Sequence, residues 1–494
     1  MTNQNRPYNE PQPEGALPVA ALESPDYEEV LVPYVREAQE VLERREIHQR
    51  RIIPPVPEGP DVVDPDPSPS IAMVPAPSAA LGLRSVGEEI RLVRNVPLSS
   101  AADNDAASEV GDPSVAINGS VVFYTGNWYA AASLDGGATF RYVDPFTAFP
   151  NPLGMSFCCD QVVHYIKKID TFVWLLQYSP DQSGANIQRL AFARTADVRS
   201  GRWRVFDITP QQLGLANVFL DFPDLAIGTN MLYLTVNGFL GQSWAATVLV
   251  RIPLNGIRSG NISAQHTISR ENFNFRVAQH CGKRAFWASH NTTSSLRVFS
   301  WDERAAAPTF NDVAVARWAA GSFQSRTPGG VNWLGRADPR ISGATKAGHD
   351  LWFAWGANRG GTNSRPQPYI QIARINSKTL GLVDNINLWD EQAALCYAGL
   401  TSNSRREVGV SYMIGGGRRF PSHAVGILTG NRRDCLCVEG SRAPARDQWG
   451  DYLTIRRCYP KTKLFAATGY TMQHGAGVHD ATPHFVIFGR SADV

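Results

Sequence analysis

The sequence predicts an all-β, seven-bladed β-propeller closed by an N-terminal strand and preceded by a long arm, and three observations support this. Charged residues make up 19% of the 494 residues, below the roughly 25% of average soluble domains, while 42 glycines and 33 prolines indicate many turns. Three short strand-like runs recur in the same order in seven copies. One further strand-like segment precedes the first copy, as a closed ring of blades requires.

Residues 1–85 form the arm. They hold 15 of the 33 prolines and none of the 12 tryptophans, so they bury too little apolar surface to offset the entropy of ordering them. After Pro33, however, apolar side chains recur at helical spacing from Tyr34 onward, with two Glu–Arg pairs four residues apart. We therefore expect a largely disordered, Pro-rich arm with one short amphipathic helix at about 34–50. This helix either packs on its own domain, is only nascent, or docks a partner protein.

Residues 86–494 hold the repeats. The most apolar run of each copy is the middle one, and these runs begin at Val121, Phe172, Met231, Arg284, Leu351, Val408 and Leu464. A strand-like run precedes each of them, another follows and ends in a turn, and segments such as RWRVFDI suit a fourth, outer strand. The last copy stops soon after its third strand. We therefore expect the segment from Glu88, EEIRLVRNVPL, to supply the outer strand of the seventh blade.

One turn of the first copy carries a motif. Its residues fit the pattern S-x-D-x-G-x-T-W/F, and they are Ser133, Asp135, Gly137, Thr139 and Phe140. In this pattern Gly permits a tight turn, Asp accepts hydrogen bonds from backbone amides across it, and the ring packs between sheets. At this point the chain resembles the Asp-box, or BNR-repeat, propellers of the sialidase-like superfamily, and two partial copies of the motif lie at 195–203 and 300–310. The Asp box is structural, so the resemblance implies the fold and not the chemistry.

The catalytic set of sialidases is not recognisable in this chain. Sialidases resemble one another in an F/Y-R-I-P motif before the first box, three arginines that hold a carboxylate, and a Tyr/Glu nucleophile pair. Here an R-I-P sequence, Arg251 to Pro253, ends a strand of the third copy, and Tyr452 has no Glu partner nearby in sequence. The resemblance therefore implies no sialidase activity, and the catalytic residues stay unknown.

Acidic residues recur at one position of the repeats. The residues that open the innermost strands are Asp112, Asp160, Asp224, Gln279, Asp338, Ala398 and Asp451. Innermost strands begin near the propeller axis, so we expect these carboxylates to meet at one end of the central channel, alongside Arg340 and Tyr452. Converging carboxylates raise one another's pKa or bind a cation such as Ca²⁺. The alternative is that each Asp pins a blade-to-blade loop by accepting hydrogen bonds from backbone amides.

Two functions agree with this pattern. The loops on the same face are rich in Gly, Asn, aromatic and basic residues, as in GANRGGTNSRPQP from Gly356. Such loops around carboxylates suit a carbohydrate or similar polar ligand, whose rings stack and whose hydroxyls need donors and acceptors; two carboxylates could also hydrolyse it. The alternative is a noncatalytic scaffold for protein–protein interaction, recruited through the N-terminal arm.

Other functions are disfavoured by composition. The net charge of +2 gives no surplus for nucleic acid, and no run of about 18 apolar residues could cross a bilayer. The N-terminus lacks the basic and apolar regions of a secretory signal, so a cytoplasmic or unconventionally exported protein is expected. The seven cysteines, including the adjacent Cys158 and Cys159, are odd in number and lack CxxC spacing. We expect thiols, with the state of Cys158 and Cys159 left open, no zinc site and no required cofactor, with Ca²⁺ as an open alternative.

Overall fold

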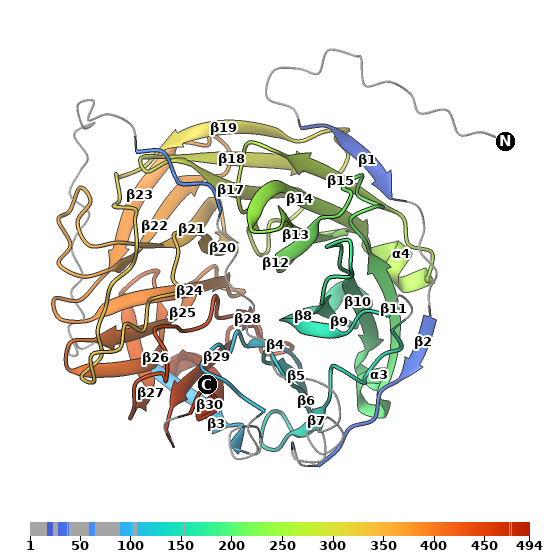
Figure 1. The fold of residues 1–494 in the computed structure, drawn as a ribbon, viewed down its shortest axis with the longest axis horizontal. Coiled ribbons are helices and arrows are strands. Elements are labelled where there is room, and N and C mark those ends of the chain that lie inside the picture. The colour runs from blue at the N-terminus through green and yellow to red at the C-terminus, as the bar shows by residue number, and fades with distance from the viewer. Residues whose placement is uncertain are drawn as a thin grey trace.

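The computed structural model describes residues 17–22, 28–36, 38, 59–64, 89–99, 101, 106–151, 154–473, 475 and 477–494. The strands of these segments form seven antiparallel sheets, arranged as blades around a central axis (Figure 1). The predicted all-β, seven-bladed propeller is therefore confirmed.

We number the blades in chain order and give their strands from the innermost outward. Blade 1 contains β4 (Ser114–Asn118), β5 (Val121–Thr125), β6 (Ala130–Ser133) and β7 (Arg141–Val143). Blade 2 contains β8 (Phe157–Ile166), β9 (Thr171–Tyr178), β10 (Gln188–Arg194) and β11 (Arg202–Ile208). Blade 3 contains β12 (Phe219–Ile227), β13 (Met231–Leu240), β14 (Ser243–Pro253) and β15 (Ala264–Ser269). Blade 4 contains β16 (Arg276–Val277), β17 (Arg284–Thr292), β18 (Ser295–Asp302) and β19 (Thr309–Ala314).

The remaining blades follow the same plan. Blade 5 contains β20 (Ile341–Ala347), β21 (Asp350–Ala357), β22 (Tyr369–Asn376) and β23 (Leu382–Leu388). Blade 6 contains β24 (Ala394–Ser402), β25 (Val408–Gly416), β26 (Arg419–Ile427) and β27 (Arg433–Gly440). Blade 7 contains β28 (Ile455–Arg457), β29 (Phe465–Met472), β30 (Ala481–Arg490) and β3 (Ile90–Pro97). Short helices connect some strands: η1 (Lys167–Ile169), α3 (Thr195–Ser200), α4 (Leu254–Ser259) and η2 (Ser491–Asp493).

The ring is closed by the segment that precedes the first blade. Strand β3 pairs antiparallel with β30, from Ile90 opposite Arg490 to Pro97 opposite His484. The prediction that EEIRLVRNVPL completes the seventh blade is therefore confirmed. Because this pairing joins the segment before the first blade to the last blade by backbone hydrogen bonds, it holds the ring closed.

The described residues 17–36 of the arm lie on the outside of the propeller, whereas residues 59–64 lie against the loops of blade 4, where the Thr293 amide donates to the Val63 carbonyl at 3.0 Å. Strand β1 (Val19–Leu22) pairs with β15, and β2 (Glu28–Leu31) pairs with β11, so blades 3 and 2 each gain a fifth strand (Figure 1). Val35 then bridges to Tyr142 of blade 1. We expected no strands in this segment. They form because the outer strand of a blade offers unpaired backbone N–H and C=O groups, which can bind an extended chain of any sequence. Most of the helix predicted at 34–50 lies outside the described residues.

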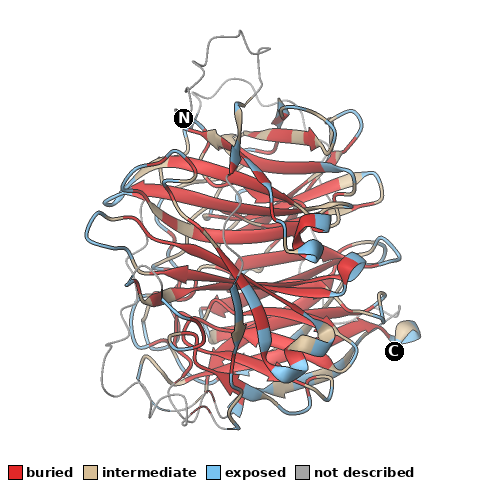
Figure 2. Cartoon of the chain, turned by 90° about the vertical axis from the view of Figure 1, so that its right-hand side faces the viewer, coloured by how far each residue is buried: buried red, intermediate tan, exposed pale blue. Residues whose placement is uncertain are grey.

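The core lies between the blades. Every residue of β5, β9, β25 and β29 is buried, which explains why the middle runs are the most apolar of each copy (Figure 2). Between blades 1 and 2, Phe123 packs with its ring centroid 5.0 Å from Trp174 and 5.0 Å from Trp203. Each blade is covered on both faces by its neighbours, so a polar residue in a middle strand would be buried from both sides.

The turn between β6 and β7 has the contacts that its sequence motif predicts. Asp135 accepts hydrogen bonds from the backbone amides of Ala138 at 2.9 Å and Thr139 at 3.0 Å, and from the Thr139 hydroxyl at 2.6 Å. Gly137 has a φ of +84°, and a Cβ there would lie 2.1 Å from the ring of Phe485 in blade 7. The motif therefore shapes a turn and seats blade 1 against blade 7.

Candidate functional site

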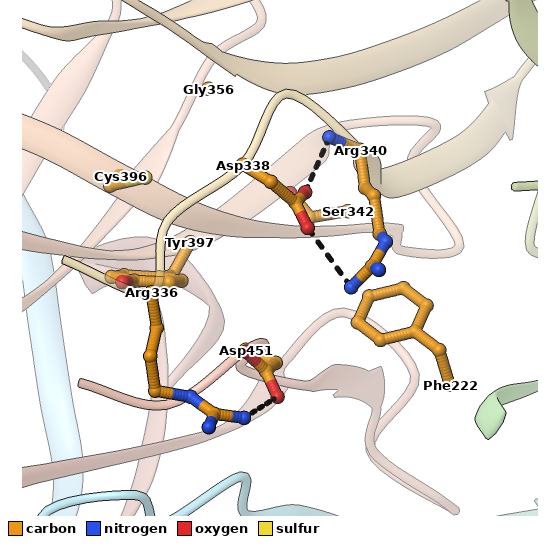
Figure 3. A pocket seen from close by; sticks show the side chains of 9 residues that line it. All are labelled: Phe222, Arg336, Asp338, Arg340, Ser342, Gly356, Cys396, Tyr397 and Asp451. Atoms are coloured by element: carbon orange, nitrogen blue, oxygen red, sulfur yellow. Dashed lines mark hydrogen bonds and ion pairs between the residues drawn. The ribbon is translucent and has the colours of Figure 1, made fainter. Parts of the chain in front are cut away.

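The innermost strands of several blades begin around one end of the central channel, which we call the mouth. A cavity at the mouth is lined by Phe222, Arg336, Asp338, Arg340, Ser342, Gly356, Cys396, Tyr397 and Asp451 (Figure 3). Three of these, Asp338, Arg340 and Asp451, are candidates from the sequence. Arg336 and Tyr397 were missed, because neither stands at the position where the repeats align.

Two ion pairs face each other across this cavity (Figure 3). The guanidinium of Arg336 lies 2.8 Å from the Asp451 carboxylate, and that of Arg340 lies 2.9 Å from the Asp338 carboxylate. Arg340 also lies 4.6 Å from the ring centroid of Phe222. The Asp338 side chain is 31% exposed but that of Arg340 only 5%, so the carboxylate is the open member of its pair. The mouth therefore presents hydrogen-bond acceptors, donors and an aromatic ring together.

Asp112 has a structural role beside the mouth. Its carboxylate accepts hydrogen bonds from the backbone amides of Asp451 at 2.5 Å and Tyr452 at 3.2 Å, and from the Asn127 side chain at 2.8 Å. Burial, together with the negative charge of Asp451, raises the pKa of Asp112 to about 7. These bonds tie the segments before blades 1 and 7 together, as the loop-pinning alternative proposed.

Asp160 differs from Asp112. Its residue is only 6% exposed, and its carboxyl forms no hydrogen bond with the described residues. Burial is the largest influence on its pKa, and the nearby carboxyls of Asp221, Asp112 and Asp451 add to it, so the pKa lies well above its usual range. Burial therefore favours the protonated form of Asp160, and none of the described residues forms a hydrogen bond with its carboxyl.

A bulge in β12 decides whether Asp221 or Asp224 lies near the carboxyls of Asp112, Asp160 and Asp451. The register of β12 shifts between Asp221 and Asp224, and Phe222 between them has a φ of +55°. Asp221, which the sequence analysis missed, accepts a hydrogen bond from Gln177 at 2.7 Å, and burial raises its pKa. Asp224 lies instead in a second cavity, where it binds Arg276 at 2.7 Å and Tyr452 is a neighbour. The sequence LDFPD shows both acids close together, but the position of a bulge, and therefore which acid lies near Asp160, cannot be found from side-chain alternation alone.

The state of Cys158 and Cys159, which the sequence leaves open, is that of a bonded pair. Cys158 and Cys159 form a disulfide, with a Cα–Cα distance of 3.7 Å, directly before Asp160. Adjacent side chains of a regular strand point to opposite faces, but the register of β8 shifts between Phe157 and Gln161, and this irregularity brings both sulfurs together. The other cysteines are free thiols, as expected: Cys281, Cys396, Cys435, Cys437 and Cys458.

The R-I-P sequence of the third copy lies in a strand away from the mouth. Arg251, in β14, donates to the Gln265 side chain at 2.8 Å and stacks 3.6 Å from the ring centroid of Trp301. The expectation that it ends a strand agrees with the structure, since β14 runs to Pro253.

Two further expectations concern metals and membranes. In the part of the chain that the structure describes, no group of three or more His, Cys, Asp or Glu side chains is arranged to hold a metal ion. The Ca²⁺ alternative stays a prediction. No described helix has the length and apolar character needed to span a bilayer.

No family model matches the chain, and no curated protein sequence matches it. Among solved structures, the α-L-arabinanase of Penicillium chrysogenum is 8% identical with a TM-score of 0.39, covering 80% of this chain and 98% of that one. The Pan2 WD40 domain of Neurospora crassa is 10% identical with a TM-score of 0.41, covering 82% and 96%. The sialidase of Trypanosoma rangeli is 8% identical with a TM-score of 0.37, covering 72% and 56%. These distant matches include both glycosidase and WD40 propellers, so they do not select a function.

Proposed function

We propose that the mouth binds a carbohydrate and cleaves a glycosidic bond, with Asp160 as the acid. The observation that carries this proposal is the buried carboxyl of Asp160, whose pKa is raised well above its usual range by burial and by the neighbouring carboxyls of Asp221, Asp112 and Asp451. A buried carboxyl whose pKa is raised by its neighbours is suited to donate a proton as a general acid.

The charge of the mouth supports a neutral, hydroxyl-rich ligand. The guanidiniums of Arg336 and Arg340 balance the carboxylates of Asp451 and Asp338. The raised pKa of Asp160 favours its neutral form, so these acids leave little net charge to attract a cation or a polyanion. Sugar hydroxyls both donate and accept, and can therefore bind a carboxylate and a protonated carboxyl in the same site.

Hydrolysis needs two carboxyls in different protonation states. The raised pKa of Asp160 suits this residue to donate the proton that a leaving oxygen requires. Asp451 interacts electrostatically with Asp160 and carries the negative charge of its ion pair with Arg336. We assign Asp451 as the nucleophile or base, and Asp338 with Arg340 as groups that orient the sugar.

The test is a glycan-array screen of the full chain with Ca²⁺ and with a chelator, followed by a reducing-end assay on any glycan bound. We expect Asp160→Asn to abolish cleavage and weaken binding at least tenfold. Asp302→Asn is the matched control, because its side chain is 40% exposed at the end of β18 and its nearest cation, Arg284, lies 3.9 Å away. Unchanged binding and cleavage by Asp160→Asn would overturn the proposal, and so would a screen in which no glycan binds.

The noncatalytic scaffold would be the alternative after such a negative screen. The large apolar side chains that are exposed in the described parts of the chain are Leu31, Val63, Val93, Leu240, Val383, Leu436 and Val494. They belong to the arm, the C-terminal residue and the strands of several different blades. The observation therefore gives the scaffold no defined docking patch.

A further inference from the structure

A second cavity lies deeper in the central channel. It measures about 20 Å³, enough for a water molecule or a small ion, and it shares Ser342 with the cavity at the mouth. Its charged lining residues are Asp224, Arg276 and Arg456, from the inner strands β12, β16 and β28. The cavity is therefore surrounded by strands of several blades.

Arg456 is the unusual member of this lining. The residue is only 6% exposed. Its Nε donates to the Val163 carbonyl and its Nη1 to the Ile455 carbonyl, both at 3.3 Å, but its Nη2 has no partner in the described structure. Burial lowers the pKa of Arg456 to about 10, and the charge of Arg276 contributes. The side chain is still a cation at neutral pH, with an N–H left unsatisfied.

Among the described residues no carboxylate forms an ion pair with Arg456, although the charge of Asp224 acts on it. Asp224 is the acid of the cavity lining, and its carboxylate already binds Arg276 at 2.7 Å. His164 does not contribute a charge, because burial and Arg456 lower its pKa to about 3. Two guanidiniums thus share one carboxylate in a site with little access to water. An unbalanced charge in such a place is strongly unfavourable unless a counterion accompanies it.

We propose that this channel cavity binds one small monovalent anion, held by Nη2 of Arg456 and by the guanidinium of Arg276. The chemistry fits a halide or a short carboxylate such as formate, since the volume excludes larger ions. The site is independent of the proposed carbohydrate function. By joining groups from several inner strands, the anion stabilises the folded ring, and this stabilisation grows with the logarithm of the anion concentration.

The first test is thermal unfolding of the full chain in sodium chloride, bromide or formate, compared with sodium gluconate at the same ionic strength. We expect the Tm to rise with the concentration of at least one small anion and not with gluconate. A chloride response identifies a halide site, and a response to formate alone identifies a carboxylate site. Equal Tm values in all four salts would overturn the proposal.

Two variants and a crystal structure test whether the anion raises the Tm by binding in this cavity. Arg456→Met should abolish the anion response, whereas Arg457→Met should lower the Tm but keep the response. Arg457 is the matched control because its guanidinium already donates to the Ser402 and Asn403 carbonyls, at 2.9 and 3.1 Å. If Arg456→Met does not fold, the test is a crystal structure of the unaltered chain, with crystals grown in the anion that raised the Tm. With bromide, anomalous scattering should show a peak, and with formate, the electron density should show the ion, within hydrogen-bond distance of Nη2. An empty cavity, or an anion response that survives in Arg456→Met, would overturn the proposal.

Discussion

The substitution Asp160→Asn separates a ligand-facing carboxyl from a structural one. Asparagine has nearly the shape of a protonated carboxyl, and the Asp160 side chain forms no hydrogen bond with the described residues. The substitution therefore removes no contact that holds the fold together. At acidic pH, we expect the free energy of unfolding of the variant to lie within about 0.5 kcal/mol of that of the unaltered chain.

The difference in the free energy of unfolding between Asp160→Asn and the unaltered chain should grow as the pH rises. Because the pKa of Asp160 is higher in the folded than in the unfolded chain, its proton stabilises the fold fully below the unfolded pKa of about 3.9. This contribution is lost as the pH rises toward the folded pKa. Asparagine has no proton to lose. The variant should therefore gain stability relative to the unaltered chain, by up to about 1.4 kcal/mol per pH unit across that window.

Asp224→Asn is the matched comparison, since both acids come from the same position of the aligned repeats. It removes the charge that faces Arg276 at 2.7 Å and leaves a buried cation, so we expect a loss of about 3 kcal/mol at neutral pH. Guanidinium chloride unfolding of both variants at pH 5 and pH 8 measures these differences. If Asp160→Asn loses as much stability as Asp224→Asn, or if its difference from the unaltered chain is the same at both pH values, the reasoning is refuted.

Three more outcomes are expected. Asp135→Ala removes the acceptor of the Ala138 and Thr139 amides and should destabilise the fold by about 0.5 to 2 kcal/mol, read as a lower Tm; no change would contradict the role of the turn. Deletion of residues 1–38 removes β1, β2 and the 3.2 Å hydrogen bond from Trp203 to Tyr34, and should lower the Tm, whereas an equal Tm would show the arm to be dispensable. In alkylation followed by mass spectrometry, Cys435 should be labelled in the native chain, but Cys158 and Cys159 only after reduction. Native labelling of Cys158 would contradict the disulfide.

The ring of blades could be predicted because its pattern is local and repeated. The middle runs predicted to begin at Val121, Met231 and Val408 begin β5, β13 and β25 at those residues. Burial of each blade between two neighbours makes these runs apolar, so each copy carries the same signal. The strands of the arm could not be predicted in the same way. Their pairing with β11 and β15 uses backbone groups, which every sequence provides.

The site was determined in part by the sequence and in part by the tertiary structure. Aligned repeats were enough to bring Asp338, Arg340 and Asp451 to the mouth. Only the fold decided that Asp221, and not Asp224, lies near Asp160, because one extra residue in a strand sends the following side chains to the other face. Only the fold brought Arg336 to Asp451, 115 residues away, and buried Asp160 near the carboxyls of Asp221, Asp112 and Asp451. Strand periodicity depends on neighbouring residues, whereas ion pairs and burial depend on distances across the closed ring.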